Sequence, residues 1–218
     1  MRVAGVDGCR GGWLVATARA EPFELVAVEV VADIAAVIAD DQLAYVAVDM
    51  PIGLPDNAPR ACDAAARAML GPRRSSVFSA PVRDVLSAVD YPDALVRSRA
   101  ACGRGLSIQA WNLVPRIIQL DQAMTPRLQD RVRETHPELC FARLGAGPLA
   151  NPKRRADGRA ERIALVGTPP PTPRGAATDD VLDAIALAHG AAGFARDDGR
   201  CVGDHALDAR GLRMQIWW

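Results

Sequence analysis

The sequence predicts an α/β fold: a mixed five-stranded sheet with helices on both faces. Three observations lead to it. Short apolar runs separated by turn residues open the chain, as in an antiparallel meander. A continuous apolar run at 43–49 then follows a short helical pattern, as in a strand buried in a parallel sheet. Finally, residues 178–192 form a helical pattern with scarcely any polar face, so this helix should be buried.

The N-terminal elements follow in order. Residues 3–7 are a strand that ends in the turn G-C-R-G-G, and residues 13–18 return as the second strand of a hairpin. Residues 23–31 alternate as a third strand. Residues 32–40 suit a short helix, and the strand at 43–49 is ended by Pro51.

The remaining chain is mainly helical, with one more strand at 131–135. The segment G-P-R-R-S-S-V-F-S-A-P has no periodicity and should be an exposed loop, whereas T-P-P-P-T-P-R-G should be a stiff connector. We expect one domain over 1–218, with a helical and loop insertion at about 52–105 and an irregular tail at about 196–218. The expected helices are 59–70, 84–102, 106–124, 137–144, 160–166 and the acidic helix from 178.

Composition limits the function classes. Net charge is zero and the pI is about 6.8, so no global field attracts nucleic acid or a membrane, and any anion site must be local. The five cysteines contain no C-x-x-C pair, which suits a reducing compartment. There is no signal-peptide pattern and no apolar run near the ~20 residues that a membrane helix needs. We therefore expect a cytoplasmic protein without a membrane partner.

Aspartates end two of the predicted strands. Asp7 and Asp49 each follow an apolar run, and aspartate is disfavoured inside strands. If the first and fourth strands are parallel neighbours, both carboxylates reach one edge of the sheet, where ligands of open α/β sheets bind. Taken singly, either residue is also explained as an ordinary turn residue.

The helix that begins T-D-D-V-L-D carries further acids. Thr178 is a good N-cap, and acids favour the first turn, so Asp179 and Asp180 are equally well explained as capping residues. Asp183 lies one turn further in, where neither side of the helix offers water, and no Lys or Arg lies within a turn of it. A buried carboxylate is costly unless it is paired, hydrogen-bonded or bound to a cation. Its partner must come from elsewhere in the chain, and a metal ion is a candidate.

Gathered carboxylates repel one another unless a cation lies among them. Ligands that are all carboxylate oxygens favour Mg²⁺ or Mn²⁺ over zinc. Two such ions about 4 Å apart would activate a water molecule and stabilise the leaving oxygen of a phosphodiester. The predicted metal ligands, which are also predicted catalytic residues, are Asp7, Asp49, Asp180 and Asp183.

Glu134, His136 and Glu138 of the motif E-T-H-P-E are each open to more than one interpretation. Glu134 is a further catalytic acid or ligand, a hydrogen-bond acceptor for a ligand residue, or only the solvent side of an alternating strand, and whether Glu138 is a ligand is open as well. His136 is held extended by Pro137 and is either a proton carrier or, more simply, a turn histidine.

Two basic runs are candidate phosphate sites. Arg73, Arg74, Ser75 and Ser76, with Arg83 beyond them, would form an exposed anion patch near the acids. A second run is formed by Lys153, Arg154 and Arg155. Either run is equally well an ordinary solvated surface. No Lys or His stands at catalytic spacing from the two serines, which argues against a serine nucleophile.

Five motifs, in this order, resemble the predicted nucleases of RNase H-like fold that are catalogued as a domain of unknown function. They are V-A-G-V-D-G-C-R-G-G-W, V-A-V-D-M-P-I-G-L-P, G-P-R-R-S-S-V-F-S-A-P, E-T-H-P-E and D-D-V-L-D-A-I-A-L-A. The resemblance runs from residue 2 to about 195 and implies a five-stranded RNase H-like sheet. Asp7 matches the acid of the first strand and Asp49 the acid that ends the fourth. Asp180 and Asp183 resemble the paired acids on the last helix of the Holliday-junction resolvase branch.

We therefore expect a metal-dependent nuclease that acts on DNA or RNA and uses Mg²⁺ or Mn²⁺. Two alternatives stay open. D-G-C-R-G-G also resembles the phosphate-holding turn of sugar kinases and actin-like ATPases, although those proteins contain two copies of the domain and no second such turn occurs here. The other alternative is a catalytically silent binding scaffold that uses the arginine loop.

Overall fold

The computed structural model describes residues 1–218 and shows an α/β architecture with a mixed five-stranded sheet. The sheet order is β3-β2-β1-β4-β5. β1 runs antiparallel to β2 and parallel to β4, and β5 runs parallel to β4, so the predicted adjacency of the first and fourth strands is confirmed. The strands are β1 (Arg2–Cys9), β2 (Gly12–Ala20), β3 (Phe23–Val31), β4 (Leu43–Val48) and β5 (Val132–Glu134).

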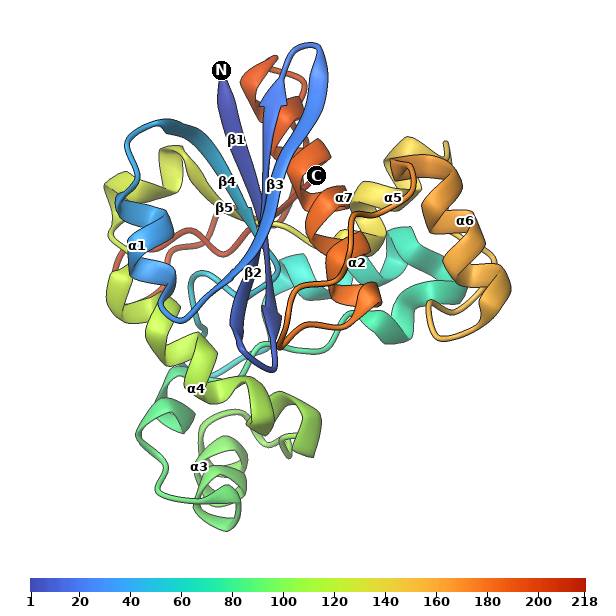
Figure 1. Ribbon diagram of the computed structural model, residues 1–218. Helices are drawn as coiled ribbons and strands as arrows, with labels where there is room; N and C mark the ends of the chain where they lie inside the picture. The colour runs from blue at the N-terminus through green and yellow to red at the C-terminus, as the bar shows by residue number, and fades with distance from the viewer.

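Helices cover both faces of the sheet, and each face has its own apolar core (Figure 1). Buried residues of α7, α2 and α5 form one core with Val3 and Leu14. Buried residues of α1 and α4 form the other with Ala4 and Val6. The helices are α1 (Ile34–Ala39), α2 (Ala61–Leu70), α4 (Ile108–Ala123), α5 (Pro137–Leu144) and α7 (Thr178–Ala195).

α7 lies directly on the central strand because Gly5 has no side chain. A Cβ added at Gly5 would lie 2.1 Å from Ala184 O and 2.2 Å from Ala188 N. Any larger residue would push the helix away from β1. This close approach brings the first turns of α7 to the carboxyl end of β1.

The segment between β4 and α4 contains short helices joined by loops, and it differs from the sequence prediction in two places. The predicted helix at 84–102 is divided into the 3₁₀ helix η2 (Arg83–Ser87) and α3 (Tyr91–Cys102). The break occurs at Asp90, whose carboxylate accepts from the Asp93 N–H at 2.8 Å and caps α3. The predicted loop at 71–81 begins with a second 3₁₀ helix, η1 (Gly71–Ser76).

Between α4 and α7 the chain forms the 3₁₀ helix η3 (Pro126–Asp130), β5, α5 and α6 (Ala156–Val166). α6 begins earlier than the predicted 160. α7 begins at the predicted residue, but its N-cap is Ala177 and not Thr178.

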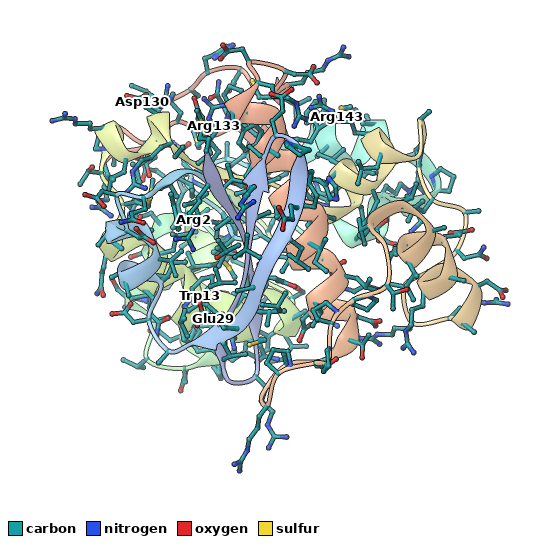
Figure 2. The ribbon with its side chains drawn as sticks, turned by 45° about the horizontal axis from the view of Figure 1, so that its top comes forward. Arg2, Trp13, Glu29, Asp130, Arg133 and Arg143 are labelled. Atoms are coloured by element: carbon teal, nitrogen blue, oxygen red, sulfur yellow. The ribbon has the colours of Figure 1, made fainter.

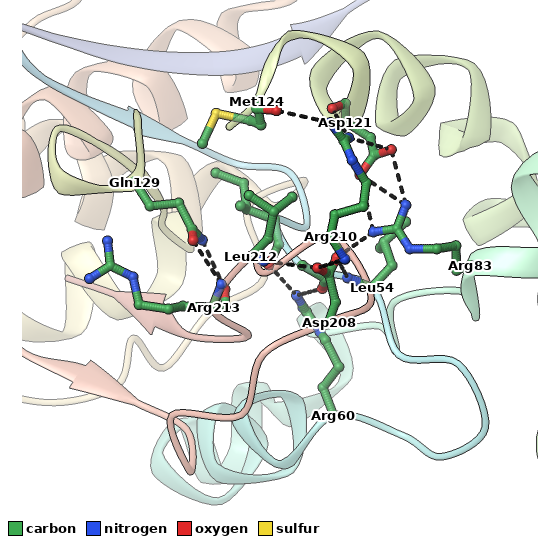
Figure 3. Close-up of polar contacts among 12 residues, drawn as sticks. Leu54, Arg60, Arg83, Asp121, Met124, Gln129, Asp208, Arg210, Leu212 and Arg213 are labelled. Atoms are coloured by element: carbon green, nitrogen blue, oxygen red, sulfur yellow. Dashed lines mark hydrogen bonds and ion pairs between the residues drawn. The ribbon is translucent and has the colours of Figure 1, made fainter. Parts of the chain in front are cut away.

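The C-terminal tail is largely irregular in secondary structure and contains one short pair of strands. β6 (Cys201–Val202) and β7 (Ile216–Trp217) pair antiparallel. The carboxylate of Asp208 accepts from the backbone N–H groups of Leu54, Arg210 and Leu212 and pairs with Arg83, as Figure 3 shows. These bonds hold the tail against the segment that follows β4.

Arg133, which is labelled in Figure 2, lies on the edge strand β5 and contacts the aromatic ring of Trp217 near the C-terminus. Its guanidinium lies 4.1 Å from the ring centroid of Trp217, 4.8 Å from Phe194 and 5.1 Å from Tyr45. These cation–π contacts join β4, β5, α7 and β7 in one packed edge.

No helix of this fold is both long and apolar enough to span a bilayer.

Candidate functional site

The predicted strand acids lie at the carboxyl ends of β1 and β4. Alternate residues of a strand share a face, and Asp7 continues the row of Val3 and Gly5 that faces α7. Asp49 directly follows β4, and its backbone N–H donates to Val6 O at 2.9 Å. The parallel pairing of β1 and β4 therefore places both carboxylates at the same edge of the sheet.

Asp183 reaches this edge from α7. It precedes Ala184, the residue whose carbonyl lies against Gly5, and it is only 3% exposed. Asp7 is 9% exposed. Three carboxylates from β1, the end of β4 and α7 thus occupy one poorly hydrated neighbourhood, which we call the aspartate cluster.

Burial and mutual repulsion disfavour the charged forms of this cluster. The pKa of Asp7 is raised well above its ordinary value, first by burial and then by Asp49 and Asp183. Burial raises the pKa of Asp49 to about 7 and that of Asp183 to about 6, against the attraction of Lys153. Asp7, Asp49, Asp183 and Lys153 therefore interact although they come from four separate segments of the chain.

Lys153 supplies the partner that the sequence requires for Asp183. Its Nζ lies 2.5 Å from Asp183 Oδ2, and it comes from the segment between α5 and α6. Burial lowers the pKa of the Lys153 amine, but attraction by Asp183, Asp7 and Asp49 outweighs burial and raises it. The ammonium is therefore the cation that stabilises the aspartate cluster.

Two predicted acids have other partners. Asp180 Oδ2 accepts from the Ala177 N–H at 2.8 Å, so this carboxylate caps α7, and it affects Asp7 only as the smallest of the charges that raise its pKa. Glu134 is held by Arg60, with Nη2 at 2.6 Å from Oε1 and Nη1 at 2.7 Å from Oε2, and also accepts from the Ile52 N–H. Both oxygens of Glu134 are therefore bound inside the protein, which argues against the predicted role as a catalytic acid.

A polar cleft of about 520 Å³ opens beside the aspartate cluster. The predicted arginine loop borders it through Arg73, Ser75 and Ser76, whereas Arg74 is exposed and lies outside the lining. Apart from two prolines, every lining side chain is polar or charged. The lining residues are Asp49, Arg73, Ser75, Ser76, His136, Pro137, Glu138, Pro152, Lys153, Arg154 and Asp183.

Glu138 is a fourth carboxylate of this cleft. Its Oε1 pairs with Arg162 and, at 3.4 Å, with Arg73, whereas its Oε2 is buried and has no hydrogen-bond partner. Repulsion from Glu138 contributes to the raised pKa values of Asp49 and Asp183, which places its charge near theirs. A buried carboxylate oxygen without a donor is a free ligand position.

His136 is a capping residue with a defined protonation state. Its Nδ1 accepts from the Glu138 N–H at 3.2 Å, so the ring proton lies on Nε2, which faces Ser76 O at 3.3 Å. Burial lowers the pKa of the imidazole. His136 therefore orients the start of α5 and links it to η1.

The sequence matches the model of one protein family, described as "Protein of unknown function (DUF429)", over residues 5–208. The chain belongs to the DUF429 family. No curated protein and no solved structure matches it.

Sequence reasoning missed the partner of Asp183 and the free oxygen of Glu138 in this DUF429 chain. Lys153 lies 30 residues from Asp183, so no helical or strand periodicity relates the two. A compositional signal was nevertheless present, because Lys153 is the only lysine of a chain whose other bases are arginine. Glu138 was visible in E-T-H-P-E, but only the contacts of Arg162 and Arg73 distinguish it from Glu134.

The raised pKa of Asp49 has a testable consequence. A carboxyl whose pKa is higher in the folded than in the unfolded state binds extra protons when folded, so its contribution to stability is lost as pH rises from about 4 to about 7. Without metal, we expect the unfolding free energy of the wild type, relative to Asp49→Asn, to fall by at least about 1 kcal/mol across this window. Urea denaturation of both proteins in EDTA measures this difference. A constant difference would mean that Asp49 titrates as an ordinary exposed acid.

Proposed function

We propose that this DUF429 chain is a metal-dependent nuclease of RNase H-like fold. The observation that carries the proposal is the aspartate cluster, in which Asp7, Asp49 and Asp183 converge from β1, β4 and α7 beside a cleft bordered by basic residues. Three acids with raised pKa values at one sheet edge, of which Asp7 and Asp183 are buried and Asp49 is half-buried, are typical of a functional site rather than of a core. The strand order β3-β2-β1-β4-β5, with an antiparallel meander followed by parallel strands, supports the RNase H-like assignment.

The residues of the cleft fit a divalent ion. The donors are all carboxylate oxygens, which Mg²⁺ and Mn²⁺ prefer, and Glu138 Oε2 adds a buried oxygen with no donor of its own. No group of three or more His, Cys, Asp and Glu side chains is already arranged to hold a metal. In this structure the positive charge near these carboxylates comes from Lys153, which pairs with Asp183. Asp7, Asp49, Asp183 and Glu138 are the residues that would hold the metal.

When bound, such an ion would lower the pKa of a water molecule and neutralise charge on a phosphodiester. The chain's own contribution is to bind and orient the phosphate. Arg73 and Arg154 offer positive charge at the cleft, and Ser75 and Ser76 offer hydroxyl groups. The lining contains no apolar side chain for base stacking apart from its prolines, so this cleft suits contact with the sugar–phosphate backbone.

The turn after β1 argues against the ATPase alternative. In a phosphate-holding turn the backbone N–H groups must be free to bind the ligand. Here the Gly11 N–H donates to Gly175 O at 2.8 Å, and Arg116 covers the turn by donating to Cys9 O and Gly12 O. The Gly11 N–H is therefore not free to bind a phosphate.

The test is cleavage of fluorescently labelled single-stranded and duplex DNA and RNA with Mg²⁺ or Mn²⁺. We expect cleavage of at least one substrate by the wild type, and loss of that activity to background in Asp49→Asn because a cluster carboxylate is removed. Asp56→Asn is the matched control, since Asp56 is an exposed acid on the segment after β4 and should retain activity. The proposal fails if folded, Mn²⁺-binding protein cleaves none of the four substrates, or if Asp49→Asn is as active as the wild type.

A further inference from the structure

Lys153 is the single cation that contacts the aspartate cluster. Neither Asp7 nor Asp49 has a side-chain hydrogen bond or ion pair, and Asp183 has one, to Lys153. Two nearby arginines, Arg73 and Arg162, pair with Glu138 and not with the aspartate cluster. One ammonium group therefore opposes three carboxylates, of which Asp7 and Asp183 are buried and Asp49 is half-buried.

The backbone beside Lys153 is anchored. The Asn151 N–H donates to Glu161 at 3.1 Å, and its side-chain amide donates to the same carboxylate at 2.6 Å. Gly158 lies against the Pro152 carbonyl so closely that a Cβ there would be 2.1 Å from the oxygen. The segment is thus fixed on α6, and the side chain of Lys153 extends from it into the cleft.

The Lys153 side chain can leave Asp183 without unfolding the segment. It is 40% exposed, whereas the Asp183 side chain that it contacts is 4% exposed. A flexible lysine held by one hydrogen bond is a weaker clamp than the bidentate Arg60–Glu134 pair nearby. The contact therefore joins the buried Asp183 carboxylate to a lysine side chain that can move away from it.

We propose that Lys153 is an exchangeable internal cation: it neutralises the aspartate cluster until a divalent metal binds, and metal binding displaces it towards the phosphate side of the cleft. This inference rests on the proposed metal-dependent function. Displacement links metal binding to phosphate binding, since the ammonium leaves the carboxylates and joins Arg73 and Arg154 along the same cleft. Metal binding then neutralises the aspartate cluster and at the same time adds a positive charge beside Arg73 and Arg154.

Calorimetric titration of Mn²⁺ into the wild type, Lys153→Met and Arg154→Met tests the competition. Lys153→Met removes the competing ammonium, so we expect its affinity for Mn²⁺ to rise at least roughly tenfold. Arg154→Met removes the same charge from the next residue, which is exposed and has no ion pair, and should change affinity by less than about threefold. An equal rise in both variants, or none in Lys153→Met, would overturn the exchange while leaving the nuclease proposal intact. Failure of all three proteins to bind Mn²⁺ would overturn both.

Labelling of the amine in the wild type gives an independent measurement that needs no variant to fold. Because Lys153 carries the only lysine amine, acetylation by an N-hydroxysuccinimide ester reports on this group alone once the N-terminal peptide is separated by mass spectrometry. We expect saturating Mg²⁺ to increase the labelling rate at Lys153 several-fold while the α-amino group is unaffected. An unchanged rate at Lys153 under conditions where metal is bound would show that the ammonium stays on Asp183, against the proposal.

Discussion

Replacing Arg60 with methionine is expected to lower the free energy of unfolding by about 3 to 5 kcal/mol, the largest stability effect that we expect in this fold. The guanidinium is 2% exposed and pairs with two carboxylates, Asp63 and Glu134. It also donates to the carbonyl oxygens of Ile52 and Gly53. Methionine fills much of the volume but leaves two buried carboxylates without their cation.

Arg67→Met is the matched control for this prediction. Arg67 lies on the same helix, α2, and donates to Val77 O and Ser79 Oγ, so its loss leaves no buried charge unpaired. We expect it to cost less than about 2 kcal/mol. Urea denaturation of the two variants gives the comparison. If Arg60→Met costs no more than Arg67→Met, the buried ion pairs contribute little.

The Arg60–Glu134 pair also shows what the sequence cannot reveal about Glu134. Glu134 ends β5 much as Asp49 ends β4, so local pattern treats the two alike. They differ only in their partners, and Arg60 lies 74 residues from Glu134. A sequence without known contacts cannot distinguish a carboxylate already neutralised by an arginine from one that is available to a ligand.

The difference between local pattern and distant contacts also decides which parts of the fold could be predicted from the sequence. The central strands could be predicted because β1 and β4 are apolar runs bounded by Gly8 and Pro51, and side-chain alternation then places Asp7 and Asp49. The packing of the tail could not be predicted, because it depends on contacts with distant residues, such as Asp208 with the Leu54 N–H and Trp217 with Arg133. Local periodicity predicts elements, whereas contacts between distant polar groups decide how irregular segments pack.

Two acidic groups at neighbouring strand ends are thus neutralised in different ways. Glu134 is held by a bidentate arginine with its remaining donors satisfied, which suits a permanent structural tie between β5, α2 and the segment after β4. The aspartate cluster is opposed by one partly exposed lysine. The first arrangement fixes the frame of the cleft, and the second leaves its carboxylates open to exchange.

The response of stability to Mn²⁺ is the second large expected effect. A ligand that binds only the folded state stabilises it by RT ln(1 + [L]/Kd), about 2.7 kcal/mol at a hundredfold excess over Kd. We expect a gain of this size in the wild type, largely lost in Asp183→Ala and Asp7→Asn because each removes a cluster carboxylate. Thermal melts with EDTA and with Mn²⁺ measure it, and Asp56→Asn, which alters an exposed acid, should keep the full gain.

The metal-free behaviour of Asp183→Ala completes this prediction. The substitution removes one of three mutually repelling carboxylates, and alanine favours the helix, while the lost ion pair involves a lysine that is 40% exposed and still near Asp7 and Asp49. We therefore expect the metal-free variant to be at least as stable as the wild type. A wild type that is indifferent to Mn²⁺, together with an Asp183→Ala variant that melts several degrees lower, would show that the Lys153–Asp183 pair is a structural tie. The aspartate cluster would then be part of the frame, and the nuclease proposal would fall with it.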